Sequence, residues 1–211
     1  HRAAVTRLRG LEFKRDVVVE SYTREQLLDF LKGELDKELT PAEAVRYQRG
    51  YAKFGLIPPD LDLRKAYLDL LGSSIGGFYH PQTKELRLIK PDPATETEME
   101  KLNRQMAQAM GIDLEKMVLV HELTHAAQDQ NFELSTLPMD DDTNDDLILA
   151  IKAVIEGDAS LVGMAEFGDM FIAMTIQGYK SGQLPGAANA LPVFLKQTLT
   201  DVTDEVLHMF E

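Results

Sequence analysis

The stretch MVLVHELTHAAQDQNF, residues 117–132, contains two histidines four positions apart with a glutamate directly after the first. In an α-helix this spacing places both imidazoles on one face, about one turn apart, where their nitrogens can reach a single metal ion. Glu122 is rotated by about 100° from His121 around the helix axis, so its carboxylate can reach a metal-bound water instead of the metal. The pattern His121-Glu122-x-x-His125 therefore predicts a hydrolytic zinc site with Glu122 as general base.

A purely structural helix is the alternative to a metal site, and each histidine would then need a hydrogen-bond partner in the core. The other side of the helix is apolar, which suits a helix that packs firmly and holds its histidines rigidly; it carries Leu119, Leu123, Ala126 and Ala127. We interpret the segment as metal binding. That interpretation requires a third protein ligand.

The third ligand is expected on the helix that follows. Glu156 stands among apolar residues, and a carboxylate there is costly to bury unless it is paired or binds a metal. Gly157 costs a helix roughly 1 kcal/mol relative to alanine, which indicates a need for close helix approach or for substrate space. Asp158 is a candidate acceptor for the non-ligating nitrogen of a histidine, and Gln128 lies on the histidine face as a second supporting residue.

Other residues remain as alternatives. Glu166 is the main rival ligand, although about 80° of helical rotation separates it from Glu156, so the two are not interchangeable. His1, His80 and His208 are the remaining histidines. An extended motif with a third histidine is excluded, because residues 128 and 131 are glutamine and asparagine. For Glu156 and Asp158 the structural alternative is a solvent-facing charge on an amphipathic helix.

The elements that must position these residues are mainly helical. Capping boxes at Thr23 and Thr40 predict helices within residues 1–72. Residues 73–90 change to an alternating pattern around turn-forming residues, which predicts a β-hairpin. Further helices are expected over 113–131, within 145–177 and over 192–211. We therefore expect a mainly α, α+β fold, organised as one domain over residues 1–211 with a short hairpin or small sheet before the histidine helix.

The hairpin is also a candidate for substrate binding, because an extended peptide can pair with an exposed strand edge. Its candidate contacts are Gly77, Phe78 and Tyr79, and Tyr179 is a further candidate from a later loop. Tyr79, Tyr179 and His208 are candidate donors to the oxyanion. A structural hairpin that covers the core is an equally acceptable reading.

Composition narrows the function classes. The chain has 211 residues, a net charge of −13 and no cysteine, which excludes thiolate metal sites and disulfides. An acidic surface disfavours nucleic acid and anionic lipid as partners, and no apolar run is long enough for a membrane span. The chain begins with histidine instead of methionine. We expect a secreted or cell-envelope protein whose signal peptide or anchor has been removed.

The ten residues His121-Glu122-Leu123-Thr124-His125-Ala126-Ala127-Gln128-Asp129-Gln130, followed by Glu156-Gly157-Asp158-Ala159, resemble a group of little-characterised bacterial and archaeal zinc metallopeptidases of the gluzincin type. The upstream GGFYHPQTKEL resembles the strand–turn–strand that precedes the motif in that group, and a looser similarity extends to the minigluzincins. The resemblance covers about residues 75–165. It implies a helical zincin-like catalytic domain, one zinc ion, Glu156 as third ligand and Glu122 as general base.

Two features depart from the thermolysin-like gluzincins. Those enzymes have an aspartate four residues after the ligand glutamate that orients a zinc histidine, and this chain has Ser160 there. The gap between His125 and Glu156 is also longer than in those enzymes. The serine at that position weighs against Asp158 as the residue that orients a zinc histidine.

The expected function is zinc-dependent hydrolysis of peptide bonds, in which Glu122 activates the metal-bound water and a peptide or protein is the substrate. The alternative, from a different class, is a catalytically inactive metalloprotease-like domain that binds peptides as a scaffold. The sequence leaves open the natural substrate, endo- or exopeptidase action, and the oligomeric state.

Overall fold

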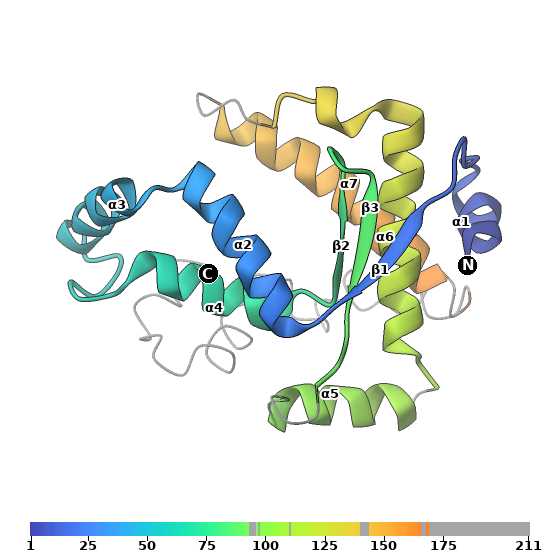
Figure 1. Cartoon of the computed structure of the whole chain (residues 1–211), viewed down its shortest axis with the longest axis horizontal. Helices are drawn as coiled ribbons and strands as arrows, with labels where there is room; N and C mark the ends of the chain where they lie inside the picture. The colour runs from blue at the N-terminus through green and yellow to red at the C-terminus, as the bar shows by residue number, and fades with distance from the viewer. Residues whose placement is uncertain (93–95, 97, 110, 140–143, 166–167, 169–211) are drawn as a thin grey trace, which may run out of the picture. The chain divides into compact units, whose positions relative to one another are not determined.

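The computed structural model describes residues 1–92, 96, 98–109, 111–139, 144–165 and 168. Their fold is α+β, as predicted, with mainly helices and a small three-stranded sheet (Figure 1). The described residues form two compact units: the first contains His1–Tyr22 and the described residues from Gly76 onward, and the second contains Thr23–Ile75. The predicted helix over 192–211 lies outside the described residues.

The second unit consists of α2 (Arg24–Glu38), α3 (Pro41–Lys53) and α4 (Leu63–Ser74). Both predicted capping boxes are confirmed, because Thr23 and Thr40 each exchange hydrogen bonds with the third residue of the helix. α4 lies close to α2, since a Cβ on Gly72 would stand 2.6 Å from Leu28 Cδ2. No helix in the described part of the chain combines the length and apolar character that crossing a bilayer requires.

The first unit contains α1 (Arg2–Arg9), β1 (Val18–Tyr22), β2 (Gly77–His80), β3 (Glu85–Ile89), α5 (Glu98–Ala109), α6 (Leu114–Phe132), a 3-10 turn (Leu134–Thr136) and α7 (Asp145–Ala165). The sheet has the order β1-β3-β2. The predicted hairpin is confirmed as the antiparallel pair β2 and β3. β1 runs parallel to β3.

Strand β1 lies within residues 1–72, where the sequence analysis predicted helices and no strand. It pairs from Val18 opposite Glu85 to Tyr22 opposite Ile89. A local signal for it exists, because three consecutive valines precede Glu20 and β-branched residues favour strands. The partner strand lies far along the chain, however, so the pairing that stabilises β1 is not visible in its own neighbourhood.

The two faces of the hairpin differ because successive side chains of a strand point to opposite sides. Tyr79 and Leu86 face each other across the strands and are buried against α6. Phe78 and Arg87 form the next pair and lie on the other face, where both contact Tyr22: the two aromatic rings meet edge-on at 6.3 Å, and the guanidinium lies 4.8 Å from the Tyr22 ring centre.

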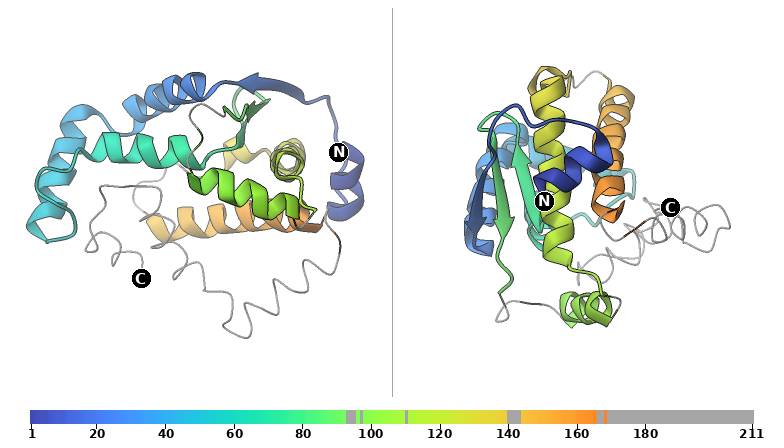
Figure 2. Two further views of the ribbon diagram at one scale, coloured as in Figure 1. Left: turned by 90° about the horizontal axis from the view of Figure 1, so that it is seen from below. Right: turned by 90° about the vertical axis from the view of Figure 1, so that its right-hand side faces the viewer.

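Helix α6 lies between the sheet and α7, with α1 packed against both helices (Figure 2). The sequence predicted one apolar and one polar face, but this helix is buried on all sides from Glu122 to Gln130. Elements on every side explain the burial, which includes polar residues that must then find partners. The core around it is formed by Val5, Tyr79, Leu86, Val120, Leu123, Ala126, Ala127 and Val162.

Two glycines allow neighbours to approach α6 closely. A Cβ on Gly77 of β2 would lie 2.8 Å from Val118 Cγ1, inside van der Waals contact. A Cβ on Gly163 of α7 would lie 3.4 Å from the main-chain oxygen of Met117 and 3.8 Å from His121 Cβ. Residues without side chains thus bring β2 and α7 against the segment of α6 that carries the histidines.

Candidate metal centre

Three side-chain atoms from two helices converge at the middle of α6. The Nε2 atoms of His121 and His125 are 3.0 Å apart. Glu156 of α7 places Oε2 at 3.2 Å from the first nitrogen and 3.4 Å from the second. Within the described residues, this is the one group of three or more histidine and acidic side chains arranged to hold a metal ion.

The dimensions of this triangle fit a tetrahedral metal ion. Ligand bonds of 2.0–2.2 Å at tetrahedral angles separate neighbouring ligand atoms by about 3.3 Å, which matches the three observed edges. Two imidazole nitrogens and a carboxylate oxygen are ligand types that zinc accepts, and together they leave a fourth position open. His121, His125 and Glu156 could therefore hold a zinc ion without rearrangement of their helices.

The orientation of Glu156 follows from the face of α7 that packs on α6. Ala159 and Gly163 lie three and seven residues after it, and residues at these spacings share one side of a helix. Ala159 is fully buried and Gly163 lies against His121. Glu156 extends the same face at its solvent end, so its carboxylate is directed to the histidines.

Glu156 and Gly157 lie in surroundings that differ from those the sequence suggested. The Glu156 side chain is 61% exposed, so the cost of burying a carboxylate does not explain its position; it lies at the edge of the α6–α7 contact. Gly157 has open space where a Cβ would stand. It therefore does not serve close helix approach, which Gly163 provides, and the reading as space for a substrate remains.

Glu122 is a buried carboxylate, 6% exposed, on the helix turn that carries both histidines. Burial raises its pKa, and the charge of Glu156 adds to this effect. The two histidines and a hydrogen bond from the backbone N–H of Tyr79 act in the opposite direction without reversing it. The carboxylate is thus held by the hairpin and has a higher proton affinity than an ordinary glutamate.

Contacts within the group of His121, His125 and Glu156 also shift the pKa values of Glu156 and His125. Hydrogen bonds from His121 and His125 hold the pKa of Glu156 far below its usual range. Burial alone would lower the pKa of His125, but its hydrogen bond with Glu156 and the charge of Glu122 outweigh burial, and the pKa is raised. The site therefore combines an ionised carboxylate with an imidazole that retains its proton more strongly than usual.

The sequence predicted that Asp158 accepts a hydrogen bond directly from a histidine, but the structure places Gln128 between them. The Nδ1 atom of His125 lies 2.9 Å from Oε1 of Gln128 instead. The amide nitrogen of Gln128 donates to Asp158 Oδ2 at 2.8 Å. The Gln128 side chain thus stands between the histidine of α6 and the aspartate of α7.

The candidate substrate-binding residues are divided by the fold. Gly77 lies in β2 against Val118, which gives this glycine a packing role. Phe78 lies on the face of the sheet opposite to the buried Tyr79. The Tyr79 hydroxyl donates to Asp129 at 2.8 Å and is not directed at an oxyanion. Tyr179, His208 and the rival ligand Glu166 lie outside the described residues, and His80 Nδ1 accepts the backbone N–H of Thr83 in the hairpin turn.

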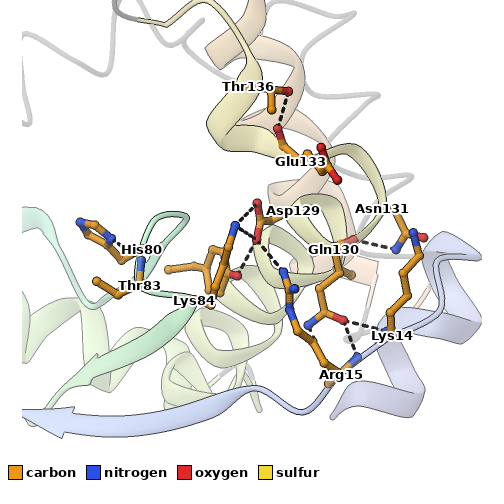
Figure 3. Close-up of polar contacts among 12 residues, drawn as sticks. Lys14, Arg15, His80, Thr83, Lys84, Asp129, Gln130, Asn131, Glu133 and Thr136 are labelled. Atoms are coloured by element: carbon orange, nitrogen blue, oxygen red, sulfur yellow. Dashed lines mark hydrogen bonds and ion pairs between the residues drawn. The ribbon is translucent and has the colours of Figure 1, made fainter.

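Sequence reasoning missed the residues at the end of α6 that hold the neighbouring segments. Asp129, whose side chain is fully buried, binds the amino group of Lys84 at 2.9 Å and lies 3.5 Å from the Arg15 guanidinium (Figure 3). Gln130 Oε1 accepts the backbone N–H groups of Lys14 and Arg15 at 2.7 and 3.0 Å. Three consecutive polar residues on a buried helix were the available signal, since each needs a partner.

Comparison of the chain with protein-family models, with curated proteins and with solved structures finds no match to any of them. The chemistry of the site therefore has to be argued from its own geometry.

Proposed function

We propose that this protein is a zinc-dependent peptidase. The observation that supports the proposal most strongly is the triangle of His121 Nε2, His125 Nε2 and Glu156 Oε2, whose edges of 3.0, 3.2 and 3.4 Å match one face of a tetrahedral zinc site. A glutamate without a metal-binding role, Glu122, lies directly beside this triangle. Three ligands, an open fourth position and an adjacent carboxylate are the parts that metal-assisted hydrolysis requires.

A bound zinc ion would polarise the scissile carbonyl and lower the pKa of a water molecule. Glu122 is the residue of this chain that moves the proton: its carboxylate accepts it from the attacking water and then delivers it to the leaving amine. Burial raises the pKa of Glu122, which brings its proton affinity closer to that of a group that must act as base and acid in turn. The Tyr79 N–H fixes the direction of the carboxylate.

Access to the site is asymmetric. The side chain of His125 is 9% exposed, that of His121 is 23% exposed and that of Glu156 is 61% exposed. Solvent and substrate therefore reach the triangle from the side of His121 and Glu156, whereas His125 forms its buried wall. Gly157, the residue after Glu156, is also exposed and has open space beside it.

Strand β2 supports a peptide as the substrate class. Gly76 accepts the N–H of Ile89 directly opposite it, so the hydrogen-bonding pairs with β3 alternate and the main-chain groups of Gly77 and Tyr79 point away from β3. This side of β2 lies beside the base, because the Tyr79 N–H bonds Glu122. An extended peptide that pairs with the remaining polar groups of this edge would bring its main chain to the metal triangle.

The test combines metal analysis with peptide hydrolysis. Protein purified without chelator and dialysed against trace zinc should contain about one zinc per chain and should cleave an unfolded fluorescent protein substrate. Glu122→Gln should retain the zinc but lose about 10²- to 10⁴-fold in kcat/KM. Glu115→Gln, an exposed glutamate on the first turn of the same helix, is the matched control and should behave as wild type.

Each outcome has a defined meaning. Absence of zinc would overturn the proposal, as would hydrolysis that survives in Glu122→Gln. Bound zinc with tight binding of unfolded protein but no cleavage would replace the enzyme with the non-catalytic peptide-binding domain.

A further inference from the structure

A continuous chain of hydrogen bonds joins the metal triangle to the N-terminal helix. His125 Nδ1 contacts Gln128 Oε1 at 2.9 Å, Gln128 Nε2 donates to Asp158 Oδ2 at 2.8 Å, and Arg9 Nε contacts both oxygens of Asp158 at 2.6 and 2.7 Å. His125 and Gln128 belong to α6, Asp158 belongs to α7 and Arg9 belongs to α1. The hydrogen-bond chain therefore connects three helices.

The orientation of the Gln128 amide is determined by its neighbours. Its nitrogen also donates to the backbone oxygen of Ile155 at 3.1 Å. A backbone carbonyl only accepts hydrogen bonds, and an ionised carboxylate paired with an arginine likewise acts only as an acceptor. Both groups therefore require the NH₂ end of the amide, and the oxygen end must face His125.

The contact with Gln128 Oε1 also bears on which ring nitrogen of His125 carries the proton. Gln128 Oε1 is an acceptor, so the neutral tautomer of His125 that satisfies it carries its hydrogen on Nδ1. A neutral imidazole holds one proton, so in this tautomer the Nε2 lone pair is free for a metal, whereas in the other tautomer Nε2–H would face Glu156. That nitrogen is the one that points to His121 and Glu156.

We propose that Gln128, Asp158 and Arg9 act as positioning residues that hold His125 in its metal-binding tautomer. The proposal rests on the zinc site proposed above and adds residues from two other helices to it. Gln128 presents the acceptor, Asp158 together with Ile155 prevents the amide from turning over, and Arg9 holds Asp158. A histidine ligand that donates its other ring nitrogen to a fixed acceptor binds metal more strongly.

A purely structural role is the competing explanation for Arg9 and Asp158, because an ion pair between α1 and α7 also ties two helices together. The chain offers a matched control. Arg2 lies on the same helix and pairs with Asp16 at 2.6 Å, but no contact connects that pair to the histidines among the described residues. Arg2→Gln and Arg9→Gln therefore each remove an arginine–aspartate pair with a similarly exposed arginine, 43% and 39%, although Asp16 is more exposed than Asp158. Only the second pair belongs to the hydrogen-bond chain.

The experiment uses two readouts that do not depend on hydrolysis. The first is the ¹⁵N spectrum of the histidine rings in the metal-free full-length chain, at a pH where the imidazoles are neutral, with His125 assigned from the spectrum of His125→Gln. The second is zinc affinity, measured by competition with a chromogenic chelator. Both are recorded for wild type, Gln128→Met, Arg9→Gln and Arg2→Gln, with circular dichroism as the check that each variant is folded.

The wild type should show His125 protonated on Nδ1. Gln128→Met, which keeps the side-chain length but removes the acceptor, should mix the two tautomers and lose about 10- to 100-fold in zinc affinity. Arg9→Gln should lose about twofold to fivefold, as expected for a partly exposed ion pair, and Arg9→Lys should recover part of this. Arg2→Gln should bind zinc as wild type does.

An unchanged tautomer in Gln128→Met would overturn the proposal, even if zinc affinity fell. Equal zinc affinities for Arg9→Gln and Arg2→Gln would remove Arg9 from it. These results remain distinct from failure of the proposed function, since a wild type that shows the Nδ1-protonated tautomer but binds no zinc would contradict the zinc site alone.

Discussion

The hydroxyl of Tyr79 donates a 2.8 Å hydrogen bond to the buried carboxylate of Asp129. This bond joins the β2–β3 hairpin to the helix that carries the histidines, and Lys84 from the hairpin turn reaches the same carboxylate. Burial, followed by the hydrogen bond and the negative charge of Asp129, raises the pKa of Tyr79 well above its ordinary value, so the hydroxyl remains a donor at neutral pH. Since the backbone of Tyr79 bonds Glu122, the contact also fixes the strand that holds the Glu122 carboxylate.

Replacement of Asp129 by asparagine should destabilise the fold. The variant loses its charge-assisted bonds to Lys84 and Arg15, and the remaining amide cannot accept from all three donors. Because both cations are partly exposed and can return to water, we expect a loss of about 2 kcal/mol in the free energy of unfolding. Urea denaturation measures it.

Asp16→Asn is the control for this substitution, since it removes an aspartate from an ion pair whose carboxylate is exposed. It should leave the denaturation midpoint nearly unchanged. Equal midpoints for the two variants would show that the Asp129 contacts do not stabilise the hairpin.

Gly77→Ala tests whether β2 needs its close approach to α6. The new Cβ would stand 2.8 Å from Val118 Cγ1 and 3.1 Å from the backbone oxygen of Arg87, so either the strand or the helix must shift. We expect a loss of about 1–3 kcal/mol, measured by thermal and urea unfolding. Addition of Val118→Ala should recover part of the loss, because it removes the nearer obstacle; a double variant as unstable as the sum of both single variants would contradict the steric explanation.

Gly157→Ala separates stability from substrate access. A Cβ at this position meets no neighbour, and alanine favours a helix over glycine by roughly 1 kcal/mol, so the variant should be more stable than wild type by up to that amount. If the open space beside Glu156 accommodates substrate, KM for a peptide should rise while zinc content stays the same. A variant that is more stable and has an unaltered KM would assign this space no role in binding.

Zinc affinity should decrease as the pH is lowered. The decrease should begin at a higher pH than it would if both histidines had ordinary pKa values. The pKa of His125 in the metal-free protein is raised above 6.5, so below that raised value a proton must be displaced before the metal binds. Glu156 contributes no such proton because its pKa is held far below its usual range. The affinity should therefore approach a loss of about tenfold per pH unit below the pKa of His125.

The raised pKa of His125 also affects the folding stability of the metal-free protein, which it increases at low pH, where it weakens zinc binding. It contributes stability that is fully present below the pKa of the unfolded state and is lost as pH rises through the folded pKa. The gain in melting temperature on adding zinc should therefore be larger at about pH 8 than at about pH 6. A zinc-induced gain that is the same at both pH values would contradict the shift assigned to His125.

Features with a local signal could be predicted from the sequence. The capping boxes at Thr23 and Thr40, the turn of the hairpin and the spacing of His121 and His125 all depend on residues within one or two helical turns of each other. The apolar sequence around Glu156 does not by itself explain the position of this residue, since its carboxylate is largely exposed and its direction comes from the packing of Ala159 and Gly163 on α6.

Features that depend on distant segments could not be predicted in this way. Strand β1 pairs with β3, which lies far along the chain. The amide of Gln128 occupies the place expected for Asp158, and this depends on how α7 packs on α6. The buried state of Asp129 and Gln130 follows from the hairpin turn and the N-terminal segment, which reach them from far along the chain. Only the buried polar run itself was visible in the sequence.

The metal triangle is tested most directly by anomalous scattering. Crystals of the full chain, grown with zinc and without chelator, would be measured on both sides of the zinc absorption edge. The account predicts one zinc peak at bonding distance, about 2.0–2.2 Å, from His121 Nε2, His125 Nε2 and a carboxylate oxygen of Glu156. A zinc ion bound by other residues, or no peak at these three side chains, would contradict it.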